Sequence, residues 1–266
     1  MQHLRAYFGT DRALDITTDR IRAFTCERQK EGAANGSINR ELAALKRAFR
    51  LMTQAERLGR APHVPMLREA SPRQGFLEPA DFARLHDALP AYLQDPVRFL
   101  YLSGWRKSEM QTLEWRDVDI AGFAIRLRPE RSKNAEPRTL PLQGELLTMI
   151  RRALDHRRLD CPYLFQGGGG PIGDFRKAWR NALKATGLGK ILIHDMRRSC
   201  IRNLVRSGTP EIVAKRLTGH KTRSVFDRYN VTSESDLAAA SARLDEYINL
   251  RQNDAPKVAV LPVRAA

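Results

Sequence analysis

Six residues between positions 106 and 229 have side chains suited to handling a phosphodiester. They are two arginines, a lysine, two histidines and a tyrosine: Arg106, Lys133, His194, Arg197, His220 and Tyr229. The cationic groups can bind phosphate oxygens and stabilise the extra negative charge of a transition state. Histidines transfer protons near neutral pH, and a tyrosine hydroxyl can attack phosphorus once it is activated. The set predicts chemistry that breaks and rejoins DNA strands without a metal ion or a nucleotide.

Arg106 follows Gly104 at the expected end of an apolar helix over 97–102. A guanidinium on such a turn projects toward a cleft, and its planar fork suits two phosphate oxygens at once. Glu109, three residues later, is predicted to support Arg106. An isolated arginine after a helix-ending glycine is more often an ordinary surface charge, so this interpretation depends on the other residues.

His194 and Arg197 follow the apolar residues 191–193 and indicate the start of a helix. Residues three apart share a helix face, and a helix N-terminus itself favours anions. The two side chains are therefore predicted to point the same way, toward a phosphate. For an isolated pair with this spacing, a solvated charge and a packed histidine are the more frequent outcome.

His220 follows Gly219 on a predicted turn, and Tyr229 comes nine residues later. A phenol with a pKa of roughly 10 needs cationic neighbours or a base to become a nucleophile. Lys133 lies in a predicted hairpin turn over 131–136. Most single tyrosines are packing residues and most turn lysines are solvated, so the argument rests on the combination.

Other motifs do not indicate a cofactor or a metal. Residues 168–173 match GxGxxG, but a proline interrupts the match and no βαβ pattern surrounds it. A flexible loop is the better interpretation. The sequence has no phosphate-binding GxxxxGK[ST] motif, and its histidines and cysteines lack metal-ligand spacing. We therefore expect no cofactor and no metal.

The elements expected to position these residues are mostly helical. Residues 1–68 predict a helical domain in which Thr17 or Thr18 caps one helix and Ser37 opens the next. Apolar residues recur at helical spacing in that second helix: Leu42, Leu45, Phe49 and Met52. The prolines and glycines of 62–77 indicate a linker, which we place at 69–75.

Residues 76–250 predict a second domain, followed by a tail over 251–266. A helix entry at 77–81 and a hairpin of alternating strands at 123–128 and 138–142 come first. Helical patterns follow at about 144–158, 174–186, 194–207, 210–218 and 222–229. Ser233 opens a capping box, and Leu237, Leu244 and Ile248 share one face of a last helix. The predicted fold class is mainly α with a small antiparallel β-sheet (α+β).

Composition indicates the partner. The 46 Lys and Arg residues exceed the 30 Asp and Glu residues, and the formal net charge of +16 favours a polyanion such as DNA or RNA. A basic enzyme from an arginine-rich proteome is the alternative. Cys26, Cys161 and Cys200 are odd in number and far apart, which argues against a disulfide framework. With no apolar run long enough for a membrane span or signal peptide, we expect a soluble, cytoplasmic, nucleoid-associated protein.

Together these residues resemble the tyrosine recombinase (phage integrase) family. The matching segments, in order, are 103–109, Lys133 eight residues before Pro141, 194–198, 217–220 and 228–230. The catalytic resemblance covers about residues 76–235. A weaker one over 4–60 resembles the family's helical core-binding domain, whose first helix is short or absent here, as is any arm-binding domain.

The resemblance implies a role for each residue of the set. Arg106 and Arg197 hold the scissile phosphate, and Tyr229 attacks it to form a 3′-phosphotyrosine. Lys133 protonates the leaving 5′-oxygen, His194 assists proton transfer at the tyrosine, and His220 hydrogen-bonds the phosphate. Candidate DNA contacts outside this set are Arg40, Lys46, Arg47 and Arg198.

The resemblance also implies partners, namely double-stranded DNA with a specific site and a homotetramer on two duplexes. Residues 233–266 are expected to pass between protomers. Two other functions remain open. A type IB topoisomerase uses similar residues, and the shortened N-terminus also suits a non-catalytic DNA-binding remnant of a mobile element.

Overall fold

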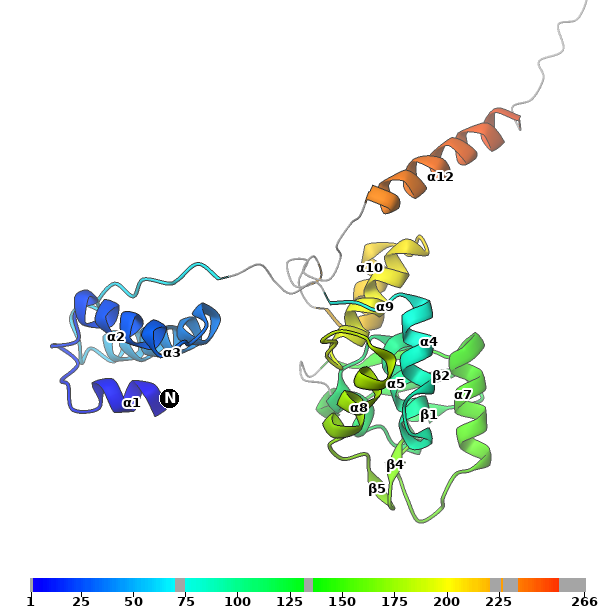
Figure 1. The fold of residues 1–266 in the computed structure, drawn as a ribbon, viewed down its shortest axis with the longest axis horizontal. Coiled ribbons are helices and arrows are strands. Elements are labelled where there is room, and N and C mark those ends of the chain that lie inside the picture. The colour runs from blue at the N-terminus through cyan, green and yellow to red at the C-terminus, as the bar shows by residue number, and fades with distance from the viewer. Residues whose placement is uncertain (1, 70–74, 132–135, 221–225, 227–233, 254–266) are drawn as a thin grey trace, which may run out of the picture. The chain divides into compact units, whose positions relative to one another are not determined.

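The computed structural model describes residues 2–69, 75–131, 136–220, 226 and 234–253 (Figure 1). The chain divides into two compact units, Met1–Arg73 and Gln74–Ala266. Within the described residues 62–69 and 75–77, which fall in the predicted linker region, there is no helix or strand. Each unit has its own apolar core.

The described part of the first unit contains the helices α1 (Gln2–Phe8), α2 (Thr18–Lys30) and α3 (Asn35–Gln54). Apolar side chains at helical spacing form its core: Leu4, Phe8, Ile21, Phe24, Ile38, Leu42, Leu45 and Phe49. Thr17 caps α2 by accepting the amide N–H of Arg20 at 3.3 Å, which confirms the predicted cap. Helix α3 begins earlier than the expected Ser37, because the carbonyl of Ala34 already accepts the amide of Ile38.

A buried amide fixes the segment that leaves the first unit. Asn39 is only 6% exposed, and its side chain exchanges two hydrogen bonds of 2.8 Å with the backbone of Leu67. Both polar ends of the amide are thereby satisfied inside the core. The extended segment near Leu67 is held against α3 in this way.

The second unit is mainly helical with small antiparallel sheets, which confirms the predicted fold class. The helices of its described residues that have defined bounds are α4 (Pro79–Asp87), α5 (Ala91–Ser103), α6 (Lys107–Gln111), α7 (Gly144–Asp155), α8 (Arg176–Thr186), α9 (Asp195–Arg206), α10 (Glu211–Thr218) and α12 (Glu234–Asn253), with short 3-10 turns at Trp115–Asp117 and Pro129–Arg131. Helix α5 is apolar on several faces, and Leu93, Val97 and Phe99 are fully buried. It packs along α9 and forms the centre of the core.

A three-stranded antiparallel sheet carries the predicted hairpin. Its strands are β1 (Val118–Asp119), β2 (Ala124–Leu127) and β3 (Arg138–Pro141), in that order. Ile125 pairs with Leu140, and both side chains are buried. Because side chains alternate along a strand, Arg138 lies on the same face as Leu140. The hairpin prediction is confirmed, and its register turns Arg138 inward.

The glycine-rich sequence at 168–173 is not the flexible loop that its composition predicts. Strands β4 (Gln166–Gly167) and β5 (Gly170–Pro171) pair in a tight hairpin. Gly168 and Gly169 form the two-residue turn with φ angles of +66° and +88°. Glycine adopts both angles without steric cost, so the composition permits a hairpin as readily as a loop.

Helix α12 shows its apolar residues to solvent. The exposed fractions of Leu237, Leu244 and Ile248 are 61%, 60% and 42%. Contacts between α12 and α9 include the pair of Arg206 with Asp236 at 2.8 Å and the bond from Arg243 to the Arg206 carbonyl at 3.2 Å. The predicted shared face exists, and within the described part of the chain it stays exposed. The predicted cap Ser233 lies outside the described residues.

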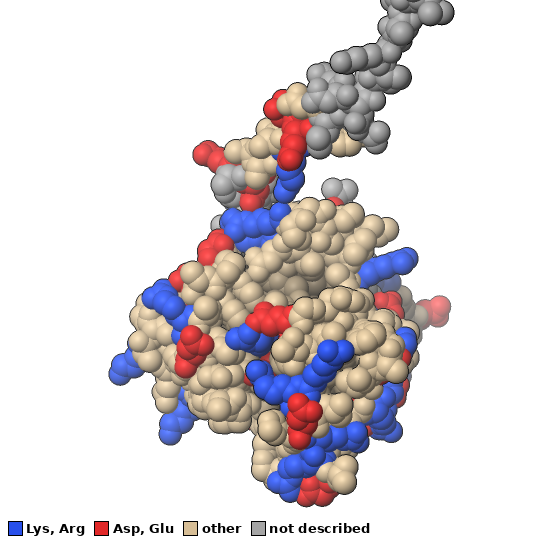
Figure 2. All heavy atoms as spheres, turned by 90° about the vertical axis from the view of Figure 1, so that its right-hand side faces the viewer, with Lys and Arg blue, Asp and Glu red and all other residues tan. Residues whose placement is uncertain are grey.

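Charge is mixed on the face of the second unit that carries α7. Figure 2 shows basic side chains there interspersed with acidic ones around a broad uncharged area. Ion pairs join α7 to α5, including Arg152 with Asp95 and Arg98 with Glu145. The net positive charge therefore does not form a continuous patch on this face. Among the described residues, no helix is both long and apolar enough to cross a membrane.

Candidate active site

A glycine turn between α5 and α6 presents Arg106. Gly104 ends α5 in the left-handed conformation with φ +64°. A Cβ atom at this position would lie 2.8 Å from Cγ2 of Thr218. Glycine therefore permits both the turn and the close approach of α10. Arg106 comes two residues later, as the N-cap of α6.

Glu109 holds Arg106 from the first turn of α6. One carboxylate oxygen accepts the amide N–H of Arg106 at 2.9 Å, and the other accepts its guanidinium at 2.7 Å. Burial alone raises the pKa of Glu109, but the Arg106 amide, the charge of Arg138 and the hydrogen bonds from both guanidiniums outweigh it and lower the pKa. The carboxylate is thus ionised and fixes the direction of the Arg106 side chain.

Arg197 links the Arg106 turn to the His220 turn. It is 2% exposed, and its Nη1 donates to the carbonyl of Gly104 at 2.7 Å. Its Nε donates to Nε2 of His220 at 3.1 Å. One guanidinium therefore joins the end of α5, the first turn of α9 and the turn after α10.

Thr218 and Arg197 both contact the ring of His220. Thr218 donates its hydroxyl hydrogen to the carbonyl of Ala214 at 2.7 Å, and the same oxygen lies 2.8 Å from Nδ1 of His220. Nη2 of Arg197 lies 3.0 Å from Nε2 and 3.1 Å from Nδ1, so both ring nitrogens face hydrogen-bonding groups. Burial, followed by the charges of Arg197 and Arg106, lowers the pKa of His220 to about 3.

His194 is the N-cap of α9, one residue before the helix that was predicted to include it. Asp195, 1% exposed, accepts the amide of Leu192 at 2.7 Å and so closes the turn that presents His194. Although His194 is an exposed residue, the protein around its ring and then Arg197 and Arg198 lower its pKa. Near neutral pH both histidines of this cluster are therefore uncharged.

The structure brings together four residues of the predicted set, Arg106, His194, Arg197 and His220. The charge of Arg106 acts on the pKa of both histidines, and His194 acts on His220. Lys133 and Tyr229 lie outside the described residues. Phe226 is described, is fully buried and meets the ring of His220 edge-on at a centroid distance of 6.0 Å.

The predicted DNA contacts occupy two different environments. Arg40, Lys46 and Arg47 are exposed on α3, where the last two share a hollow of about 470 Å³ with Arg50. Arg198 instead pairs with the buried Asp195 at 3.2 Å, and its side chain is 17% exposed. Neither environment tests DNA binding, so the DNA contacts of these four residues stay predictions.

Three residues around the cluster had no role in the sequence interpretation. Asp195 shapes the His194 turn, Thr218 contacts Nδ1 of His220, and Arg138 contacts both Glu109 and the end of α10. Strand alternation in the sequence could have predicted an inward position for Arg138, because it alternates with Leu140 and Leu142 on the buried face of its strand. An inward-facing arginine requires a partner. For Asp195 and Thr218 the sequence holds no comparable signal.

The cluster is suited to an anion rather than to a metal. The charges of Arg106 and Arg197 both act on the two neutral imidazoles, and among the described residues no group of three or more His, Cys, Asp or Glu side chains is placed to hold a metal ion. Two guanidiniums with hydrogen-bonding histidines match a phosphate group in charge and geometry.

Comparison with known proteins identifies the family. The sequence model of the phage integrase family matches residues 76–235. The integrase of Salmonella phage P22 is 25% identical over 210 residues, which are 73% of this chain and 54% of that protein. The chain thus spans about half the length of this relative.

Solved structures share the fold. The Tn1549 transposon integrase in complex with circular intermediate DNA superposes with a TM-score of 0.76 at 17% identity, covering 92% of this chain and 91% of that one. A lambda integrase tetramer bound to a Holliday junction gives a TM-score of 0.71 at 19% identity, covering 86% and 69%. At these identities the likeness concerns the fold.

Proposed function

Because the chain belongs to the phage integrase family, we propose that it is a site-specific DNA recombinase that breaks and rejoins strands through a 3′-phosphotyrosine intermediate. The observation that carries the proposal is the position of Arg197. Its guanidinium lies between the Gly104 carbonyl and His220, and its charge, like that of Arg106, acts on the pKa of both histidines, which supports a shared anion-binding cluster.

In the proposed reaction, Arg106 and Arg197 bind the scissile phosphate and stabilise its pentacovalent transition state. The Tyr229 oxygen forms a bond to phosphorus while the bond from phosphorus to the 5′-oxygen breaks. His194 takes the phenol proton, and Lys133 gives a proton to the leaving 5′-oxygen. His220 hydrogen-bonds the phosphate. Attack by the 5′-hydroxyl of a partner strand then reverses these steps.

The proposal requires no nucleotide and no metal. Each phosphodiester is exchanged for a phosphotyrosine ester of similar energy, so the strand can be resealed without an external energy source. The two arginines supply the positive charge that a metal ion supplies in other phosphoryl-transfer enzymes. Neutral histidines beside them are suited to accept a proton.

We infer that several copies act together on two duplexes. The exposed apolar residues Leu237, Leu244 and Ile248 of α12 support this inference, because burying them requires another surface. The lambda integrase structure with a Holliday junction is a tetramer and agrees with such an assembly. The domain limits 1–68, 69–75 and 76–250 belong to the same proposal, with residues 1–68 clamping the DNA.

A covalent-trapping assay tests the chemistry. The full-length protein is incubated with a pool of nicked duplexes of randomised sequence, and DNA retained under denaturing conditions is sequenced. We expect a covalent adduct with a common sequence, and Tyr229→Phe abolishes it because phenylalanine has no nucleophilic oxygen. Tyr92→Phe, at a tyrosine 55% exposed on α5, is the matched control and retains the adduct.

The outcomes separate this proposal from its alternatives. An adduct that survives Tyr229→Phe removes Tyr229 from its role as nucleophile. Tight DNA binding without any adduct favours a non-catalytic binding protein. Relaxation of supercoiled plasmids regardless of sequence favours a type IB topoisomerase.

A further inference from the structure

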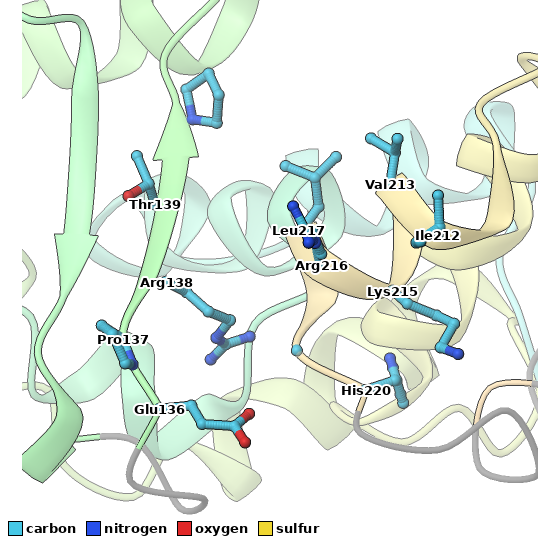
Figure 3. Close-up of a pocket in the computed structure, with 12 residues that line it drawn as sticks. Glu136, Pro137, Arg138, Thr139, Ile212, Val213, Lys215, Arg216, Leu217 and His220 are labelled. Carbon is cyan, nitrogen blue, oxygen red and sulfur yellow. The ribbon is translucent and has the colours of Figure 1, made fainter.

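Arg138 lies between the two turns that present Arg106 and His220. It begins β3 and extends across a groove of about 630 Å³ toward the end of α10, with His220 on the far side (Figure 3). Its side chain is only 8% exposed. A buried arginine costs solvation free energy unless its charge and its donors are matched by partners.

Two partners of Arg138 belong to the two different turns. Its Nη2 lies 2.5 Å from Oε2 of Glu109, the carboxylate that holds both the amide and the guanidinium of Arg106. Its Nη1 donates to the carbonyl of Thr218 at 2.7 Å, at the last residue of α10. One guanidinium thus bridges the support of Arg106 and the residue two before His220.

The surroundings of Arg138 fit an arginine closely. Gly219 has φ +71°, and a Cβ atom there would lie 2.3 Å from Nη1 of Arg138. On another side, the guanidinium carbon lies 5.0 Å from the centre of the Trp105 ring. A planar fork can hydrogen-bond the Thr218 carbonyl through Nη1 and form an ion pair with Glu109 through Nη2 at once, whereas a lysine ammonium is a single point charge.

From this geometry we propose that Arg138 is a positioning residue, which keeps Arg106 and His220 at a fixed separation for phosphate binding. The inference rests on the proposed recombinase function. Arg138 acts through Glu109 on one side and through the Thr218 carbonyl on the other, without contacting the DNA. Losing the bridge leaves the link through Arg197 but frees Glu109, and with it Arg106, to shift relative to His220. Small displacements of such groups slow a reaction strongly.

The experiment compares variants of two arginines in the same hairpin. Arg138→Lys keeps the charge but not the fork, and Arg138→Met removes both. Arg126→Met is the matched control, because Arg126 lies on β2 with its side chain 60% exposed and pairs with Asp119 at the surface. All variants are made in the full-length chain.

Two readouts are needed. The first is the single-turnover rate of adduct formation, with the affinity measured separately, on a duplex selected from the nicked pool. We expect Arg138→Met to lower the rate about 100-fold and Arg138→Lys about 10-fold, with affinity nearly unchanged. The second is the ¹⁵N NMR signals of His220 in DNA-free protein, which we expect to shift in both Arg138 variants and not in Arg126→Met.

Each outcome bears on the proposal. The proposal is overturned if Arg138→Lys reacts at the wild-type rate with unshifted His220 signals. It is also overturned if Arg126→Met loses as much of the single-turnover rate as the Arg138 variants do. If Arg138→Met does not fold, Arg138→Lys alone decides. If the wild-type protein forms no adduct, the recombinase proposal fails, and the His220 signals still decide whether Arg138 holds the turn.

Discussion

At the scale of single residues, the protonation of His220 couples the candidate site to stability. Its folded pKa of about 3 is below its ordinary value, so the folded protein binds fewer protons than the unfolded chain. The contribution of His220 to the free energy of unfolding is fully present above pH ~6.5 and is lost as the pH falls toward 3. Between pH 6.5 and 4.5 we expect His220 to reduce the free energy of unfolding by roughly 2 kcal/mol. Urea unfolding of the full-length chain at both pH values measures this loss.

The variant His220→Gln is the control, because glutamine keeps hydrogen-bonding capacity but does not titrate. The lowered pKa of His194 contributes a loss of the same sign to both proteins, so it cancels in the comparison. The wild-type protein should therefore lose more stability than His220→Gln over this pH range. Equal losses in the two proteins would contradict the low pKa.

At the scale of elements, Gly104 determines how closely α5, α9 and α10 meet. We expect Gly104→Ala to lower the free energy of unfolding by roughly 2–4 kcal/mol, from left-handed strain together with a methyl group forced against Thr218 and Cys200. Gly187→Ala is a matched control, since Gly187 also ends a helix with φ +66° but has no neighbouring atom within 4 Å. Gly187→Ala should lower the free energy of unfolding by only about 1–2 kcal/mol. Denaturant unfolding of both variants measures the difference, and equal losses would exclude the steric contribution.

Local sequence chemistry determined the elements that could be predicted. The Thr17 cap, the Gly104 helix end and the β2–β3 hairpin each follow from a few neighbouring residues. The partners of Arg138 and Arg197 could not be predicted in the same way, because Thr218 is 80 positions from Arg138, and Gly104 is 93 positions from Arg197. Such contacts depend on how α5, α9 and α10 pack together, and no short motif records that packing.

At the scale of the whole molecule, the exposed apolar residues Leu237, Leu244 and Ile248 of α12 favour binding to a second copy of the chain. Burying one large apolar side chain contributes about 1.5–3 kcal/mol, so two of them can change an association constant by roughly 100-fold or more. We therefore expect the double variant Leu244→Ser and Ile248→Ser to lose assembly on DNA while the binding of one copy persists. Sedimentation of the protein with the selected duplex, over a range of protein concentrations, measures both steps.

The same chemical change at another exposed leucine provides the control for this last prediction. Leu159 is 93% exposed in the segment after α7, so Leu159→Ser removes an apolar side chain without touching α12. It should assemble like the wild-type protein. Because Leu244 and Ile248 are 60% and 42% exposed in one copy, their loss should change the unfolding temperature little. If the α12 variant assembles normally, another surface joins the copies; if it unfolds early, α12 instead packs within its own chain.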